Sequence, residues 1–97
     1  MNATPPLVVV ATITVQSAHR TVVFDALREA VTATNQEDGC EYYALHQDIE
    51  HPDRFVMLER WRDEAALAAH AAGPALQKLR AVMGGKAELQ VIKLHAV

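Results

Sequence analysis

The chain has 97 residues, a single-domain length near the lower end of the range that one hydrophobic core stabilises without disulfides or metals. Hydrophobic residues make up 51% and charged residues 22%, so the composition excludes a disordered chain and predicts a globular domain. The net charge is −3 and the nine Lys and Arg are scattered, which argues against nucleic acid as a partner.

The sequence carries few signals of compartment. Cys40 is the only cysteine and cannot close an internal disulfide, which fits a reducing compartment. The apolar run at residues 7–15 is too short to cross a bilayer and lacks the preceding basic residues of a signal peptide. We therefore expect no membrane association and a cytoplasmic location. Residues 1–6, with two prolines, predict a flexible arm before a single domain at residues 7–97.

The first half of the chain predicts a strand followed by a helix. Residues 7–16 are rich in β-branched side chains and have a typical strand length. Ser17 is then expected to be the N-cap of a helix, because apolar residues recur at helical spacing from Val23 to Thr34. Residues 36–39 have turn composition, and Gly39 is free to adopt a positive φ.

The second half predicts two strands, two helices and a last strand. Residues 40–48 and 54–62 are strand-like and are joined by a loop that contains Pro52. Asp63 is expected to cap an alanine-rich helix, which breaks at Gly73 before a second helix that ends at residues 84–85. Residues 87–94 form the final strand. The resulting order, βαββαβ, predicts an α+β ferredoxin-like fold with a four-stranded antiparallel sheet.

Both faces of the predicted sheet are apolar, which points to a homodimer. Residues 7–15 place Val9 and Ile13 on one face and Val8 and Val10 on the other, and residues 55–61 behave similarly. Burial of apolar surface contributes about 25 cal/mol per Å², so a second face left exposed to water would lose several kcal/mol of stabilisation. Pairing with an identical chain through that face is the simplest solution, and an exposed face of small Val and Thr side chains is the alternative.

Glu59 and Trp61 are the first candidates for chemistry. Alternation places both on one face of their strand, where a carboxylate in an apolar stripe needs a partner or water. Such a buried carboxyl could have a raised pKa and act as an acid, a base or a hydrogen-bond anchor. A structural Glu satisfied by backbone amides or by Arg is the competing interpretation.

His70 and Tyr43 are the second pair of candidates. His70 lies among small alanines, which would leave room for a cavity above an imidazole that can act as a general base. A solvated helix His is an equally good interpretation. Tyr42 and Tyr43 lie on opposite faces of their strand, and placing Tyr43 in a cavity excludes His46 unless a bulge intervenes.

The remaining motifs argue against common cofactors. The five His residues show no ligand spacing such as HExxH, so we expect no metal, although a site from His46, His70 and Glu59 is imaginable. Neither GxGxxG nor GxxxxGK[ST] occurs, which does not support nucleotide binding. There is no Gly-x-Ser-x-Gly elbow for a nucleophilic serine.

Two motifs resemble the antibiotic-biosynthesis monooxygenase family over residues 7–95. They are E-x-G-C-x-x-Y, from Glu37 to Tyr43, and E-x-W, from Glu59 to Trp61, followed nine residues later by His70. The resemblance implies a dimeric α/β barrel that oxidises quinols, anthrones or similar electron-rich aromatics with molecular oxygen. It implies no cofactor, neither flavin nor metal. Arg80 stands where the haem-degrading branch of this fold would carry its axial His, which argues against haem.

By analogy with that family, each candidate residue receives a role. His70 and Glu59 would be catalytic, in proton transfer or hydrogen bonding, while Trp61 and Tyr43 would surround the aromatic substrate, with Asn35 as a further donor. Two alternatives stay open: a non-catalytic dimeric module that binds a small ligand, and an oxygen-independent isomerase or degradation enzyme acting on a small metabolite.

Overall fold

The computed structural model of the chain describes residues 5–97, so residues 1–4 of the predicted arm lie outside the described part. The elements in chain order are β1 (Leu7–Val15), η1 (Ser17–His19), α1 (Arg20–Thr34), β2 (Cys40–Gln47), β3 (Arg54–Trp61), α2 (Glu64–Ala72), α3 (Pro74–Met83) and β4 (Ala87–His95). Each predicted strand is present, and its ends agree with the prediction to within one residue.

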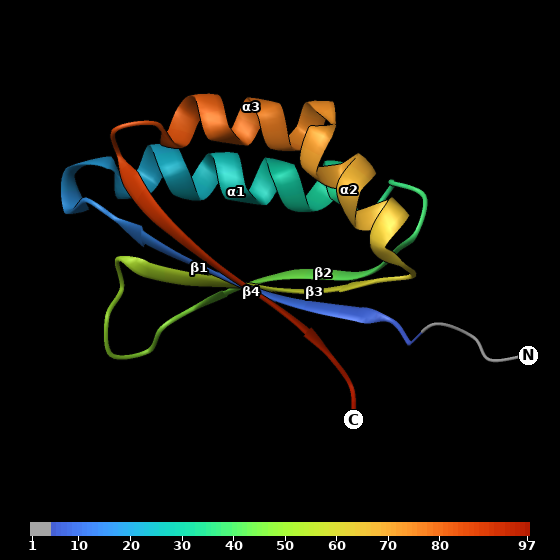
Figure 1. Cartoon of the computed structure of the whole chain (residues 1–97). Helices are drawn as coiled ribbons and strands as arrows, with labels where there is room; N and C mark the ends of the chain where they lie inside the picture. The colour runs from blue at the N-terminus through green and yellow to red at the C-terminus, as the bar shows by residue number, and fades with distance from the viewer. Residues whose placement is uncertain (1–4) are drawn as a thin grey trace, which may run out of the picture.

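The four strands form one antiparallel sheet in the order β2-β3-β1-β4. All three α-helices lie over one face of this sheet, and β4 is the edge strand that pairs with β1 (Figure 1). The α+β, ferredoxin-like fold class predicted from the element order is therefore confirmed.

The core lies between the sheet and the helices. α1 buries Val23 and Leu27 at helical spacing, and Phe24 stacks on Phe55 of β3 with ring centroids 5.6 Å apart. α3 packs beside α1, so that two helices cover the central strands. Trp61, at the end of β3, is fully buried. The end of β3 and the following helix α2 therefore contribute Trp61 and Ala66 to the core.

One predicted helix cap is confirmed and another is wrong. Asp63 caps α2, where its carboxylate accepts a hydrogen bond of 2.8 Å from the Ala66 amide. Ser17 does not cap α1, because its hydroxyl donates to the Asp53 carboxylate in the β2–β3 loop. The chain instead passes through the 3-10 turn η1, and α1 begins after His19 without a side-chain cap.

The face of the sheet opposite the helices is apolar and bare in this single chain. We call it the outer face; it includes Val8, Val10, Leu58, Ile92 and Leu94, which the strand register places side by side. Leu58, Ile92 and Leu94 are 36%, 57% and 45% exposed. Among residues 5–97, none of the helices has the length and apolar character needed to cross a membrane.

Candidate active site

A cavity of about 500 Å³ lies between the sheet and helices α2 and α3. Its floor comes from β1, β3 and β4, and most of its lining is aliphatic. The polar lining residues are Tyr43, Glu59, Glu64, His70, Arg80 and Lys93. Volume and lining are those of a site for a mainly apolar small molecule with a few polar groups to orient it.

Glu59 brings a carboxyl group to the inner end of this cavity. It pairs with Tyr43 across β2 and β3, so both side chains point to the helix side of the sheet. The indole Nε1–H of Trp61 donates a 2.9 Å hydrogen bond to Oε1 of Glu59. Burial raises the pKa of Glu59 to about 7, against the opposing effect of that hydrogen bond. The carboxyl can therefore exchange a proton near neutral pH.

His70 is held over the same region by α2. It is 4% exposed, and its ring lies against Trp61 with centroids 4.5 Å apart and against Tyr43 with centroids 5.4 Å apart. Its Nδ1 lies 2.8 Å from Oε1 of Glu37, in the turn after α1. A carboxylate only accepts hydrogen bonds, so Nδ1 carries a proton and donates it, and in the neutral tautomer the free lone pair is on Nε2.

Tyr43 supplies a hydroxyl that stays protonated. Burial, followed by the nearby charge of Glu59, raises the pKa of the Tyr43 phenol well above its ordinary value. At neutral pH this side chain is therefore a neutral hydrogen-bond donor and an aromatic wall. It cannot serve as the base in this site.

Charged side chains occur at the rim of the cavity, where Glu64, Arg80 and Lys93 are exposed. Arg80 also donates a 2.9 Å hydrogen bond to the carbonyl of Ala71, near the end of α2. The buried side chains Tyr43, Glu59 and His70 thus line an apolar cavity, and exposed charged side chains line its edge.

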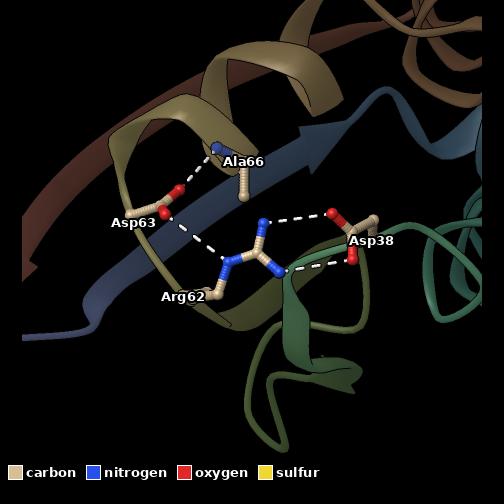
Figure 2. A network of polar contacts seen from close by, with 4 residues as sticks. All are labelled: Asp38, Arg62, Asp63 and Ala66. Atoms are coloured by element: carbon tan, nitrogen blue, oxygen red, sulfur yellow. Dashed lines mark hydrogen bonds and ion pairs between the residues drawn. The ribbon is translucent and has the colours of Figure 1, made fainter.

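An ion-pair network fixes α2 relative to the turn that carries Glu37. Arg62 donates two hydrogen bonds of 3.2 and 3.0 Å to Asp38 and a longer one of 3.5 Å to Asp63, the N-cap of α2 (Figure 2). These bonds hold the pKa of Asp38 below its ordinary value. Gly39 has φ +83°, and a Cβ on it would lie 2.4 Å from the Cβ of Ala66. Glycine is therefore needed at this close approach.

The imagined metal site is not assembled. His46 pairs with Val56 on the outer face, whereas Glu59 and His70 line the cavity on the other side of the sheet. Over residues 5–97, no group of three or more His, Cys, Asp or Glu side chains is arranged to hold a metal ion.

Comparison of the chain with known proteins shows which protein family it belongs to. The profile of the antibiotic biosynthesis monooxygenase family matches residues 6–82. The chain belongs to this family. YgiN of Escherichia coli, named a probable quinol monooxygenase, is 32% identical over 82 residues, which cover 75% of this chain and 79% of YgiN. Rv0793 of Mycobacterium tuberculosis is 31% identical over 81 residues, which cover 84% of this chain and 79% of Rv0793.

Solved structures agree with the family assignment. The crystal structure of PA3566 from Pseudomonas aeruginosa has a TM-score of 0.93 at 30% identity, covering 100% of this chain and 99% of that chain. The structure of Rv0793 has a TM-score of 0.89 and covers 95% of both chains. The resemblance drawn from the sequence motifs is therefore confirmed at the level of the family.

Three of the five family-derived site residues line the cavity of this monooxygenase-family chain: Tyr43, Glu59 and His70. Trp61 lies directly behind them and contacts Glu59 and His70 from the core. Asn35 does not line the cavity; its amide donates to the carbonyl of Val31 at 2.8 Å and to the carbonyl of Tyr43 at 3.1 Å.

Sequence reasoning missed Glu37 as a site residue. Glu37 was recognised only as a motif position, and it lies 33 residues before the histidine that it contacts. No local spacing connects the two, because the turn after α1 meets α2 only in the folded chain. The rim charges Arg80 and Lys93 were also missed, and the apolar stretches around them carry no signal of a cavity edge.

Proposed function

We propose that this chain is a cofactor-independent monooxygenase that oxidises a quinol, an anthrone or a similar electron-rich aromatic with molecular oxygen. The observation that carries the proposal is that His70 from α2 and Glu59 and Tyr43 from the sheet all line one mainly aliphatic cavity. Family membership and the name of YgiN support the reaction class.

Each side chain has a role in this proposal that follows from its environment. Nε2 of His70 is the base for an acidic hydroxyl or methylene group of the substrate, because Nδ1 is already bonded to Glu37. Glu59, with a pKa near neutrality, and the Tyr43 hydroxyl bind the oxygens of the substrate and of its anion. Trp61 backs His70 and Glu59, and Asn35 positions the Tyr43 backbone.

The chemistry needs little more from the protein. The deprotonated aromatic is itself the reductant: it transfers electrons to oxygen, one oxygen atom bonds to the ring carbon, and the other leaves as water. For a quinol the products are a hydroxyquinone and one water, so atoms and electrons balance without a further reductant. Binding, proton removal and orientation toward oxygen are the contributions expected of the cavity.

An oxygen electrode tests the proposal. The purified protein is offered a panel of reduced naphthohydroquinones and anthrones without added flavin, and the autoxidation seen without protein is subtracted. Uptake that survives a chelator and falls at least ~100-fold in His70→Ala supports the proposal. His51→Ala, at an exposed position in the β2–β3 loop outside the cavity, is the matched control and should keep most of the activity.

The result also separates the alternatives. Binding of the aromatics without enhanced oxygen uptake would favour a ligand-binding module. Turnover of a small metabolite that proceeds equally well under nitrogen would favour an isomerase or degradation enzyme. Either outcome removes the monooxygenase proposal.

We also propose that two copies of the chain pair through the outer face. Pairing would bury the exposed side chains of Leu58, Ile92 and Leu94. Burial of apolar surface stabilises a dimer by about 25 cal/mol per Å² of area removed from water. Ile92→Lys should convert a dimer to a monomer in light scattering coupled to size exclusion. Ile49→Lys, at a 98% exposed position in the β2–β3 loop, is the matched control. A wild-type monomer at micromolar concentration would contradict the pairing.

A further inference from the structure

His70 separates two hollows of the molecule. On one side it lines the candidate active-site cavity, and on the other it lines an open groove between the end of α1 and helices α2 and α3. Glu29, Glu37 and Lys78 lie along that groove. His70 therefore lies between the candidate active-site cavity and an open groove on the surface.

Glu37 is the group that faces His70 from the groove side. Its Oε1 accepts the Nδ1–H hydrogen bond of 2.8 Å, and its side chain is 23% exposed while that of His70 is only 4% exposed. The neighbouring Gly73 has no side chain, and a Cβ there would lie 4.0 Å from Oε2 of Glu37. Water in the groove can thus reach a carboxylate that touches a buried imidazole.

The other neighbours of His70 offer no comparable route for a proton. Tyr43 and Trp61 lie against its ring, and the raised pKa of the phenol keeps Tyr43 protonated. Glu59 lines the candidate active-site cavity and is hydrogen-bonded to the Trp61 indole, which can donate a hydrogen bond but cannot accept a proton. Of the three described side chains that contact the ring, Glu37, Tyr43 and Trp61, only Glu37 also lines the groove.

The position of Glu37 is fixed by the network of Figure 2. Its neighbour Asp38 is bonded twice by Arg62, which also bonds Asp63 at the start of the helix that carries His70. The Glu37 amide donates to the carbonyl of Thr34 at 3.0 Å. Backbone and side-chain bonds together hold the carboxylate within reach of Nδ1.

We propose that Glu37 is a proton-relay residue, which carries protons between Nδ1 of His70 and the solvent of the groove on the side opposite the substrate. The role rests on the proposed function only in so far as His70 is the base. Glu37 touches no substrate and acts through His70.

The protons balance over one cycle. Nε2 of His70 takes a proton from the substrate, and Nδ1 passes its own proton to the Glu37 carboxylate, which releases it to water in the groove. When the oxygen-derived leaving group needs a proton, Glu37 takes a proton from groove water and passes it to Nδ1 as Nε2 gives up the one it holds. The ring thus keeps one proton throughout, and both groups regain their starting states.

A measurement without substrate tests the relay directly. Nitrogen-15 NMR of the 97-residue chain follows the His70 ring and the exchange of its Nδ1 proton with solvent. Glu37→Gln keeps an oxygen that can accept from Nδ1–H but cannot carry a proton, so exchange should slow by at least ~10-fold. Glu29→Gln removes a carboxylate from the same groove without touching His70 and should leave the exchange rate unchanged. Exchange in Glu37→Gln as fast as in the wild type would overturn the proposal.

Oxygen uptake supplies a second, separate readout. Glu37→Ala should lose at least ~10-fold in uptake, and formate, small enough to enter from the groove, should restore part of that loss in a saturable way. A folded Glu37→Ala variant with full uptake, or one that formate does not rescue, would overturn the relay. If the wild type takes up no oxygen at all, the monooxygenase proposal fails, and the NMR exchange rates alone decide whether Glu37 relays protons.

Discussion

Replacing Glu59 by Gln should change the pH dependence of stability in a defined way. The residue is 7% exposed, and burial raises the pKa of its carboxyl from 4.5 to about 7. Folding therefore favours the protonated form of this group. Gln has the same shape, can accept the Trp61 hydrogen bond through its oxygen, and does not titrate.

The sign and size follow from linkage. Because the folded-state pKa lies above the unfolded value, the contribution of Glu59 to stability is fully present below pH 4.5 and is lost as the pH rises through 7. A difference of about 2.5 pKa units corresponds to about 3 kcal/mol. The free energy of unfolding of Glu59→Gln, relative to that of the wild type, should thus rise by about 3 kcal/mol between pH 4 and pH 8.

Urea unfolding followed by Trp61 fluorescence at a series of pH values measures this difference. Other groups that titrate in the window contribute equally to both proteins and cancel. Glu50→Gln, at an exposed position in the β2–β3 loop, is the control and should track the wild type. If Glu59→Gln and the wild type differ by a constant amount from pH 4 to pH 8, Glu59 is not a buried acid with a raised pKa.

Three further substitutions test the geometry around the site. Gly39→Ala combines a positive φ with a 2.4 Å approach to a neighbouring Cβ, so it should lower the free energy of unfolding by more than ~2 kcal/mol in a urea titration. Gly85→Ala is the control: Gly85 has φ +74° but nothing within 4 Å, so the substitution should cost only about 1 kcal/mol. Trp61→Phe removes the indole donor, so carbon-13 NMR of the side-chain carboxyl should show the pKa of Glu59 moving further upward, and an unchanged value would contradict the hydrogen bond. Asp63→Ala removes the α2 cap and should lower the midpoint of thermal unfolding, at a cost of about 1 kcal/mol; an unaltered midpoint would show that the cap adds nothing.

The fold could be predicted from the sequence because each element carries a local signal. The β-branched run from Leu7 to Val15 predicts the first strand, and the helical spacing from Val23 to Thr34 predicts the first helix, whose buried residues include Val23, Leu27 and Ala30. Gly39 and Gly73 marked the turn and the helix break correctly. Such signals are local, so they survive without knowledge of tertiary contacts.

The predictions failed at polar side chains whose hydrogen-bond partners come from elsewhere in the chain. Ser17 has the composition of an N-cap, but Asp53 from a distant loop takes its hydroxyl. Asn35 has a side chain suited to bind a ligand, but two backbone carbonyls occupy its amide. Glu37 meets His70 only because the turn after α1 packs on α2. Polar contacts between segments far apart in the chain are invisible to periodicity.

The surroundings of the two candidate acid–base groups suit them to different tasks. Glu59 lines the cavity and is bonded to an indole that donates but cannot take a proton, so the indole gives Glu59 no proton route away from the substrate. His70 is hydrogen-bonded to the Glu37 carboxylate, which lines the groove. A proton can therefore pass through Glu37 to the groove while substrate fills the cavity. On the proposed mechanism, repeated proton transfer therefore belongs to His70, and Glu59 serves to hold the substrate oxygen. Loss of Glu59 should then weaken binding more than turnover, whereas loss of His70 should abolish turnover.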